Sequence, residues 1–360
     1  ETKTMQSVSI SAYGDKIDGL VSLSSSLVPE LRKGDGNMLV KVLAVSLAPG
    51  DCRVLSGKTS LVQGPPSFPY IPGGDLCGIV VQVHDDEKKF RRGDCVVAMF
   101  DTIGPRGALA EYKLVKTSNA AIKPPSLSPE QACALPSSAL SAMLLCENCV
   151  RQGDRVLVLG GAGGVGTHLV QMLKPNGASF VAATSTQKEL LLRLGVDQVV
   201  DYRSEKWWEK EDFCSTPFDL VVDLWGTREP WDRAVSSSAV KSGYSGGRYV
   251  TMVGDTPCIV LQHWWQAFRV MWDMLARALW TSIFRSNPRW HYHVGLEPGG
   301  GNLDRLLQLA EDGRLVPVLD STHRFDADGV KKAFHVQKSR HAHGKVVIVV
   351  TVGDTAHAIN

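Results

Sequence analysis

A glycine-rich turn is the stretch of this sequence whose residues point most directly to chemistry. Gly161, Gly163 and Gly166 fit the pattern G-x-G-x-x-G, between an apolar run typical of a buried strand and a stretch with one apolar helical face. Glycine permits a tight turn and lets a pyrophosphate approach the backbone, while the helix N-terminus offers unpaired N–H groups. We therefore predict that these glycines bind a dinucleotide together with Gly164 and Val165, although such a turn can also serve close packing alone.

The segment after the next strand indicates which nicotinamide dinucleotide the turn would hold. An NAD site usually carries Asp or Glu at the tip of that strand, about 20 residues past the glycines, to bind the ribose hydroxyls. Here residues 179–184 lead into Ser185 and Lys188 with no carboxylate between them. Hydroxyl and ammonium groups attract a 2′-phosphate. The sequence therefore predicts NADPH, unless Lys188 is only a solvated lysine of a first helical turn.

The residues around the turn alternate between short apolar strands and helices. This alternation is typical of a doubly wound parallel sheet, so we predict an α/β domain of the Rossmann type. The strand candidates are residues 156–159, 179–184, 198–202, 220–224 and 248–253, and the helix candidates are residues 165–173, 186–194 and 231–240.

The N-terminal third is rich in strand and turn signals, which predicts a β-rich domain over residues 1–125. Ser128 is expected to cap the helix that follows. Strands at 315–319 and 345–350, with a helix at 328–336 between them, suggest that the chain returns to complete this domain over about residues 315–360. Residues 126–314 then form the nucleotide-binding domain. The strand candidates of the first domain are residues 38–47, 79–83, 95–100 and 109–115.

A tryptophan-rich stretch at residues 258–285 interrupts the strand–helix alternation. It is expected to be one long helix, and it carries Trp264, Trp265, Trp272 and Trp280. Arginines punctuate the stretch, so it cannot lie whole inside a bilayer. Its aromatic face could pack on the protein itself, or on a partner in a homodimer or a larger complex. A substrate lid and a contact with a membrane surface are the other interpretations.

Composition and charge exclude several classes of function. The chain has 360 residues and a formal net charge of +2, which predicts no nucleic-acid binding. No apolar run reaches the length of a transmembrane helix. The eight cysteines are scattered, and we expect them to be reduced core residues of a soluble intracellular protein. The chain starts at Glu1 instead of Met, so a targeting segment is expected to have been removed or trimmed.

Possible metal ligands are few. Cys146 and Cys149 form a tight pair, but no second pair completes a zinc site. The spacings His291-x-His293 and His341-x-His343 would place each pair on one face of a strand, yet neither has a third ligand nearby in sequence. Surface histidines are therefore the preferred interpretation, and we predict no bound metal.

Four segments together resemble a known family. They are residues 48–57, 68–75, 107–112 and 160–166, and they are similar to motifs of the medium-chain dehydrogenase/reductase superfamily, in its zinc-free quinone oxidoreductase branch. The resemblance implies a GroES-like domain and a Rossmann domain, with the active site in the cleft between them. It also places Tyr202 at the 2′-phosphate of the cofactor. Val253 and Lys345 complete the cofactor-binding set that we predict.

The resemblance also bears on the reaction. Zinc alcohol dehydrogenases of this superfamily carry Gly-His-Glu where this chain has Gly73-Gly74-Asp75, so zinc-assisted alcohol oxidation is not expected. The implied reaction is hydride transfer to a quinone or an α,β-unsaturated carbonyl. The C-terminal third resembles a mitochondrial member, which together with the branch implies a mitochondrion or plastid as the compartment.

Catalytic residues are harder to predict, because hydride transfer requires positioning more than an acid–base pair. Asp51, Arg53 and Tyr70 are the polar candidates of the first domain, although an ion pair or core packing would explain them too. Ala48 departs from the branch, which has an asparagine that would face the nicotinamide. Two alternatives therefore stay open: an enoyl reductase of lipid or polyketide metabolism, and a nucleotide-binding structural or assembly subunit with weak catalysis.

Overall fold

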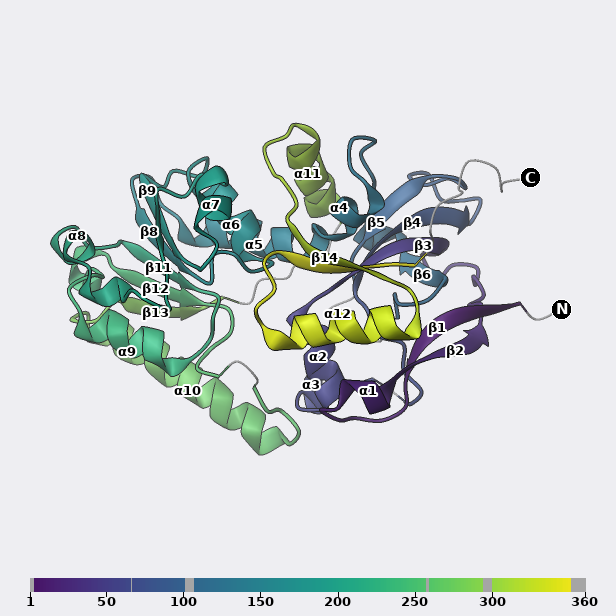
Figure 1. Ribbon diagram of the computed structural model, residues 1–360, viewed down its shortest axis with the longest axis horizontal. Helices are drawn as coiled ribbons and strands as arrows, with labels where there is room; N and C mark the ends of the chain where they lie inside the picture. Colours follow the sequence, from purple (N-terminus) through teal and green to yellow (C-terminus); the bar gives the residue numbers. More distant parts are fainter. Residues whose placement is uncertain (1–2, 66, 101–106, 257–258, 294–299, 351–360) are drawn as a thin grey trace. The chain divides into compact units, whose positions relative to one another are not determined.

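The computed structural model describes residues 3–65, 67–100, 107–256, 259–293 and 300–350, and the chain divides into two compact units (Figure 1). Unit 1 comprises Glu1–Leu140 with Glu297–Asn360, and unit 2 comprises Ser141–Leu296. Helix α5 (Pro136–Cys149) runs from the first into the second. The first limit lies 15 residues after the domain boundary that we predicted at residue 125, and the second lies 18 residues before the one that we predicted at residue 314.

Unit 2 is built on a parallel sheet, as the strand–helix alternation predicted. Its described strands form a six-stranded sheet in the order β10-β9-β8-β11-β12-β13, and every neighbouring pair is parallel. Numbered along the chain, this is the order 3-2-1-4-5-6 of a Rossmann fold, and the order reverses between β8 and β11. The strands are β8 (Arg155–Leu159), β9 (Phe180–Thr184), β10 (Gln198–Val200), β11 (Leu220–Asp223), β12 (Arg248–Thr251) and β13 (Arg289–Tyr292).

Helices and short 3-10 turns connect these strands. The tryptophan-rich stretch forms α10, although the prediction began at residue 258, which lies outside the described residues. No helix in the described part of the chain combines the length and the apolar character needed to cross a bilayer. The connecting elements are α6 (Gly166–Leu173), α7 (Lys188–Arg193), η2 (Trp207–Glu209), α8 (Glu211–Ser215), α9 (Arg228–Ser236), η3 (Gly243–Ser245) and α10 (Trp264–Ile283).

Unit 1 contains two sheets in its described residues. One is the antiparallel pair β1 and β2, and the other has seven strands in the order β14-β15-β3-β4-β5-β7, with β6 on β3. β15 pairs with β3, so the C-terminal strands join the N-terminal sheet as the sequence suggested. The strands are β1 (Thr4–Ile10), β2 (Val21–Leu27), β3 (Asn37–Leu47), β4 (Asp75–Gln82), β5 (Cys95–Ala98), β6 (Tyr112–Lys116), β7 (Ala120–Ile122), β14 (Leu319–Arg324) and β15 (Lys345–Val349).

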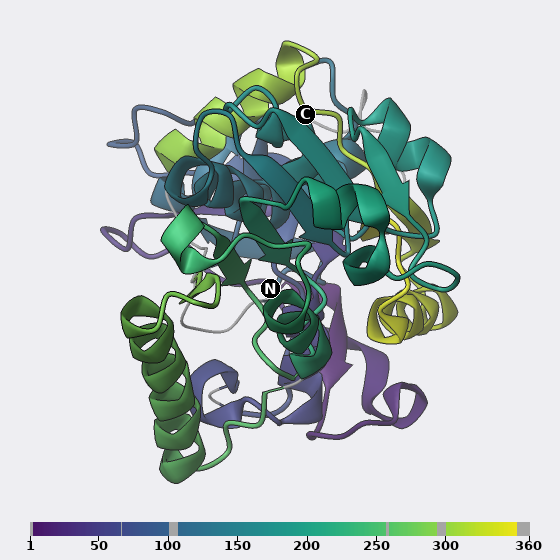
Figure 2. The same ribbon diagram turned by 90° about the vertical axis from the view of Figure 1, so that its left-hand side faces the viewer.

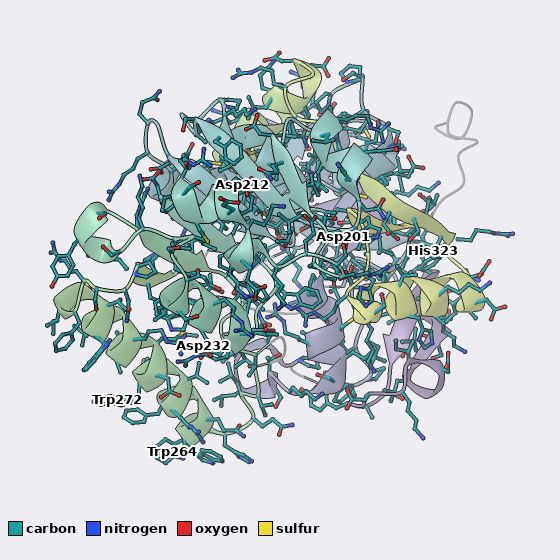
Figure 3. The ribbon with its side chains drawn as sticks, turned by 60° about the vertical axis from the view of Figure 1, so that its left-hand side comes forward. Asp201, Asp212, Asp232, Trp264, Trp272 and His323 are labelled. Atoms are coloured by element: carbon teal, nitrogen blue, oxygen red, sulfur yellow. The ribbon has the colours of Figure 1, made fainter. Side chains whose placement is uncertain are left out.

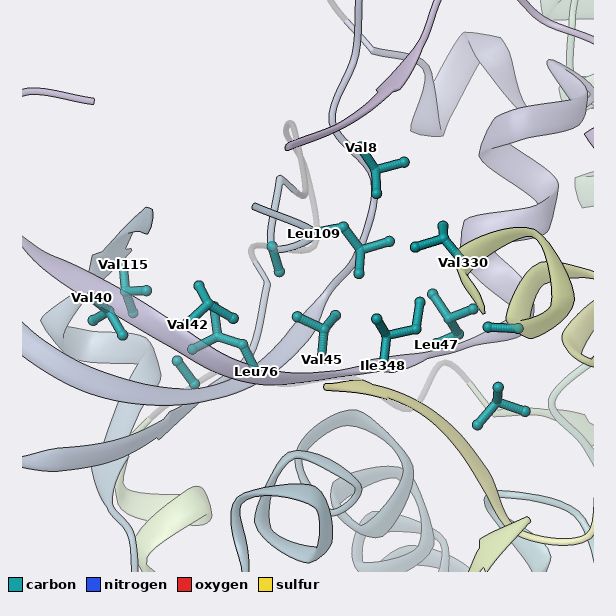
Figure 4. Close-up of a cluster of buried hydrophobic side chains, with 14 of the residues drawn as sticks. Val8, Val40, Val42, Val45, Leu47, Leu76, Leu109, Val115, Val330 and Ile348 are labelled. Atoms are coloured by element: carbon teal, nitrogen blue, oxygen red, sulfur yellow. The ribbon is translucent and has the colours of Figure 1, made fainter. Parts of the chain in front are cut away.

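The core of unit 1 lies between this larger sheet and the elements packed on it. Branched apolar side chains from β1, β3, β4, β6, β15 and α12 interlock there (Figure 4). Ser128 caps α4 as predicted, because its Oγ accepts a hydrogen bond from the Gln131 N–H at 3.2 Å. The helices are α1 (Ile17–Leu20), α2 (Pro49–Ser56), α3 (Ser60–Gln63), α4 (Pro129–Cys133), α11 (Gly300–Glu311) and α12 (Ala327–Ser339), with η1 (Thr117–Asn119).

Two element predictions were wrong. The strand expected at residues 315–319 begins only at Leu319, because Pro317 has no N–H for a ladder and Val316 is exposed. The helix expected at residues 231–240 is α9, which starts three residues earlier and ends at Ser236. Beyond it the chain bends and then forms an isolated bridge with the segment before β11, where Phe218 donates its N–H to the Ala239 carbonyl at 2.9 Å.

Candidate functional site

The glycine turn lies at the carboxyl end of β8 and is tied to the end of β9. Gly160 has φ +83°, a left-handed conformation that favours glycine. Its N–H donates to Thr184 Oγ1 at 3.0 Å, and the Gly161 N–H donates to the Thr184 carbonyl at 3.2 Å. The last residue of β9 therefore fixes the path of the turn.

The three motif glycines differ in the space around them. A Cβ on Gly166 would lie 2.5 Å from the Gly160 carbonyl oxygen, and one on Gly161 would lie 2.7 Å from Ala183 Cβ. These two positions therefore need glycine for packing. A Cβ on Gly163 would meet nothing closer than the Gly160 oxygen at 3.4 Å. The surface at Gly163 is thus open, as a backbone that receives a pyrophosphate must be.

The N-terminus of α6 follows directly and has no anion of its own. Val165 is its N-cap, and no side chain there accepts a hydrogen bond from the helix. In the described structure, the N–H groups of Gly164 and Val165 have no hydrogen-bond acceptor. Free N–H groups and the helix dipole attract an anion, and both are strongest in the first turn. The predicted site residues of the turn are thus gathered at one helix end.

The loops after β9 and β10 hold the residues predicted to select NADPH. The Ser185 N–H donates to the Val200 carbonyl at 3.0 Å, which joins the two loops, and Ser185 Oγ accepts from the Gln187 N–H at 2.9 Å. Lys188 is exposed at the start of α7. Tyr202 is 47% exposed. In the described residues from the end of β9 to Lys188, no carboxylate occurs.

Acidic residues also lie near this corner: Asp201 directly follows β10, and Glu205 comes four residues later. The pKa of Glu205 is lowered, first by the hydrogen bond from Lys210 at 2.8 Å and to a smaller degree by the charge of Lys188. Glu205 is thus paired with Lys210, and the Lys188 ammonium stays exposed to solvent. A cation in this position can bind a phosphate.

Two residues that we did not predict complete this edge of the sheet. The ring of Trp225 lies 6.3 Å from that of Tyr202 between centroids, and its backbone N is 3.8 Å from where a Gly160 Cβ would be. Asp223 ends β11 and orders this loop, because its Oδ1 accepts from the N–H groups of Trp225 at 2.9 Å and Gly226 at 3.1 Å. Their signal in the sequence was available: Asp-Leu-Trp-Gly begins with the last residue of the fourth strand, where the strand order reverses.

Val253 follows β12 and packs into the same edge. Its Cγ1 would lie 2.2 Å from a Cβ on Gly226, which has φ +74°. Its N–H donates to Thr251 Oγ1 at 3.2 Å. The structure therefore brings the glycine turn, Ser185, Tyr202 and Val253 to the carboxyl edge of one sheet, where open α/β sheets bind ligands.

The catalytic candidates of unit 1 occupy different surroundings. Asp51 is buried in α2, and its Oδ2 accepts from the Ala48 N–H at 2.8 Å. Arg53 is half-buried on the same helix. Tyr70 is buried in the core of unit 1, and its backbone exchanges two hydrogen bonds of 2.9 Å with Ile10. These contacts give Asp51 and Tyr70 structural roles, while their catalytic roles stay predictions.

Lys345 belongs to a buried polar group that sequence reasoning did not identify as a whole. It is 4% exposed at the start of β15, and Asp75 is 2% exposed at the start of β4. Burial raises the pKa of Asp75, whereas Lys345, and hydrogen bonds from Ser137, oppose this rise. Asp51 adds to it. Asp51 and Lys345 are therefore near the same carboxylate.

The structure also shows the surroundings of possible metal ligands. A Cβ on Gly74 would lie 2.6 Å from the ring of Phe100, which occupies the space of any side chain there. Burial raises the pKa of Cys146 to about 12 and that of Cys149 to about 11, so both are thiols at neutral pH. Among the described residues, no group of three or more His, Cys, Asp or Glu could hold a metal ion.

Two protein families match separate parts of the chain. The family described as "Alcohol dehydrogenase GroES-like domain" matches residues 34–126, and the one described as "Zinc-binding dehydrogenase" matches residues 194–348. The first lies within the β-rich region. The second begins just after α7, includes the strands β10 to β13 of the unit 2 sheet, and ends within β15.

Individual relatives cover most of the chain. The chain is 33% identical to the NADPH-dependent alkenal/one oxidoreductase, chloroplastic, of Arabidopsis thaliana, over 96% of this chain and 80% of the relative. It is 32% identical to the NAD(P)H oxidoreductase RTN4IP1, mitochondrial, of Homo sapiens, over 87% of this chain and 81% of the relative. The solved quinone oxidoreductase of Coxiella burnetii has the same fold, with a TM-score of 0.75 at 24% identity over 97% of this chain and all of that chain.

Proposed function

Because the chain belongs to the medium-chain dehydrogenase/reductase superfamily, as its motifs predicted, we propose that it is a zinc-independent reductase that transfers a hydride from NADPH to a quinone or an α,β-unsaturated carbonyl. The observation that carries the proposal is the open N-terminus of α6 beside a strand tip without a carboxylate. This arrangement suits a diphosphate and a 2′-phosphate together.

The choice of NADPH rests on the loops after β9 and β10. Asp or Glu at the β9 tip would bind ribose hydroxyls and repel a 2′-phosphate, and this chain has Thr184-Ser185 there. Lys188 offers an exposed ammonium, and Ser185 offers a hydroxyl. Both relatives named above carry NADPH or NAD(P)H in their names. We place the 2′-phosphate between Lys188, Ser185 and Tyr202, and we retain Lys345 as a further cofactor contact.

The proposal that no zinc takes part rests on Gly74. Zinc alcohol dehydrogenases have a histidine at the equivalent position, and here the ring of Phe100 fills the space of a side chain. A ligand could enter only if that ring moved. Metal analysis of the purified protein tests this point, and a stoichiometric zinc ion would contradict it.

Reduction of a quinone or an enone needs a hydride, a proton and correct positioning. When bound, NADPH supplies the hydride. The chain supplies the positioning: the N-terminus of α6 holds the diphosphate, and Trp225 and Tyr202 form an aromatic border beside it. For an enone the remaining proton can come from solvent, because the carbanion that follows hydride addition is stabilised as an enolate.

The test is an NADPH-oxidation screen with 9,10-phenanthrenequinone, 2-alkenals and enoyl thioesters as acceptors. We expect turnover with a quinone or an alkenal, and a lower rate with NADH. Lys188→Glu should weaken NADPH binding about tenfold while it leaves NADH binding nearly unchanged. Lys174→Glu is the matched control, because this exposed lysine lies at the other end of α6 and pairs with Asp197.

Two outcomes would redirect the proposal. Turnover with enoyl thioesters alone would favour the enoyl reductase. Tight NADPH binding without turnover of any acceptor would favour a nucleotide-binding subunit, which Ala48 also motivates because alanine offers no amide to a substrate. We also propose a mitochondrion or plastid as the compartment, since the relatives are named mitochondrial and chloroplastic. Imaging of a fluorescent fusion to the full-length protein tests this placement.

A further inference from the structure

Helix α10 exposes an apolar face along almost its whole length. Of its twenty residues, all of them described, only Thr281 is buried. Trp264 is 75% exposed, and Figure 3 shows it and Trp272 on the side of the helix that points away from the protein. We call the following exposed residues the outer face: Trp264, Trp265, Phe268, Met271, Trp272, Leu275, Leu279, Trp280, Ile283 and, just past the helix, Phe284.

The opposite side of α10 is fixed to unit 2, at whose edge the helix runs (Figure 2). Arg277 forms a two-pronged ion pair with Asp255, with one N–O distance of 2.6 Å, and its guanidinium lies 5.0 Å from the Trp290 ring centroid. Thr281 Oγ1 accepts from the Trp290 N–H at 3.1 Å. Met274 packs against the core. These contacts orient the helix, so the outer face is held outward and is not a frayed end.

The composition of the outer face suits a lipid surface better than a second copy of the chain. Within the described structure, none of the indole N–H groups of Trp264, Trp265, Trp272 and Trp280 donates a hydrogen bond. If a second copy packed on this face, indoles would lie against indoles. Asp273 would then be the only exposed carboxylate of α10 that could accept a hydrogen bond from them. Buried N–H groups without acceptors are costly. A headgroup region offers phosphate and carbonyl oxygens, and tryptophan prefers such interfaces.

The charges around the outer face favour an anionic surface. Arg269 on the helix and Arg285 just beyond it are both exposed, and Asp273 is the one acidic side chain of α10. Cations near a membrane are attracted by anionic lipid headgroups. Apolar area combined with such attraction is what holds a helix in the plane of a membrane surface.

We propose that the outer face of α10 docks on an anionic lipid surface, with the helix axis in the plane of the membrane. Aromatic and aliphatic side chains enter the boundary between headgroups and acyl chains, the indole N–H groups bind headgroup oxygens, and Arg269 and Arg285 remain at the phosphate level. Unit 2 stays in water on the other side of the helix. This surface is independent of the hydride transfer proposed above.

Flotation of the purified protein with phosphatidylcholine–phosphatidylglycerol vesicles tests the proposal. We expect the protein to float with these vesicles, less with phosphatidylcholine alone, and with a blue shift of tryptophan fluorescence. Trp272→Glu should weaken the partition on the order of tenfold or more, because it removes a large apolar side chain and adds a charge. Leu192→Glu is the matched control: Leu192 is 43% exposed on α7 of unit 2 and lies outside the outer face.

A double variant tests the electrostatic contribution to membrane binding separately. Arg269→Glu combined with Arg285→Glu should remove the preference for phosphatidylglycerol and leave the weaker binding to phosphatidylcholine. Equal flotation of the wild-type protein, Trp272→Glu and Leu192→Glu would overturn the proposal. It would also be overturned if the protein did not float and formed a dimer in sedimentation that Trp272→Glu dissociated, since a second copy would then cover the outer face.

Discussion

Each unit contains a strand-to-helix turn, and the two turns differ in whether a side chain of the chain itself binds the N–H groups at the helix N-terminus. β8 enters α6 through glycines, and the N-cap Val165 brings no side-chain acceptor. β3 enters α2 through Ala48, and Asp51 in the first turn of that helix accepts the Ala48 N–H at 2.8 Å. The N-terminus of α2 therefore carries an anion from its own chain, whereas the N-terminus of α6 does not.

The difference shows what makes a helix N-terminus a binding site. Both termini carry partial positive charge from the aligned peptide dipoles. In α2 the Asp51 carboxylate, which is buried, already neutralises this charge. In α6 the charge is left for a ligand, and the bare surface at Gly163 gives that ligand access. The nucleotide site is therefore defined as much by the missing cap as by the glycines.

The strongest test of this contrast is Gly166→Ala. The new Cβ would lie 2.5 to 2.8 Å from backbone atoms of Gly160 and Gly161, which cannot rotate away. We expect a loss of about 1–3 kcal/mol in the free energy of unfolding, typical of overpacking, together with a large loss of NADPH affinity. Urea unfolding and fluorescence titration measure the two quantities.

Gly163→Ala is the matched control for that change. Its Cβ would contact only the Gly160 oxygen, at 3.4 Å, so the unfolding free energy should change by less than about 1 kcal/mol. NADPH affinity should still fall, because the methyl group occupies the space that we assign to the pyrophosphate. If Gly163→Ala left affinity unchanged, the open surface at Gly163 would not be the binding surface.

The features that could be predicted from the sequence are those with local signals. The G-x-G-x-x-G turn, the apolar strands beside it and the cap at Ser128 each depend on residues a few positions apart, and the structure contains all of them. The strand expected at residues 315–319 failed because its apolar residues resemble a strand while Pro317 prevents the pairing. Apolar content alone does not reveal where a ladder can form.

The rest depended on contacts between distant residues. A carboxylate in a polar loop has the same sequence signature whether it caps a helix or reacts, so Asp51 could be proposed for catalysis but not recognised as a cap. Trp225 was missed for a related reason. Its position beside Tyr202 follows from the pairing of β11 with β8, of β8 with β9 and of β9 with β10, which places the ends of separate strands at one edge.

A smaller effect is expected from Asp51→Ala, which would leave the N-terminus of α2 without its anion. Loss of an N-terminal hydrogen-bond acceptor costs about 0.5–2 kcal/mol of stability. Asp51→Asn should recover most of this, because an amide oxygen can still accept from the Ala48 N–H. Thermal unfolding of the two variants measures the effect. If Asp51→Asn kept wild-type stability but abolished NADPH oxidation, the carboxylate would be a catalytic group and the contrast between the two turns would lose its meaning.

The smallest expected effect concerns Asp223, whose carboxylate accepts hydrogen bonds from backbone N–H groups of a loop next to the glycine turn. Burial raises its pKa, although hydrogen bonds from the N–H groups of Trp225 and Gly226 and from the Tyr249 hydroxyl oppose the rise. The folded state therefore holds this proton more tightly than the unfolded state does. The resulting stabilisation is complete below the pKa of an unfolded aspartate, about 3.9, and is lost as the pH rises through the higher folded-state pKa.

Asp223→Asn removes this titration and keeps the shape of the side chain. Relative to this variant, the free energy of unfolding of the wild-type protein should fall as the pH rises from about 4, by no more than about 1.4 kcal/mol per pH unit, and then become constant. Urea unfolding at a series of pH values measures the difference. A difference that grew in favour of the wild-type protein with rising pH would mean that hydrogen bonds outweigh burial at Asp223. The loop beside Gly160 would then hold a stable negative charge near the proposed phosphate site, and the contrast between an open α6 and a self-capped α2 would need revision.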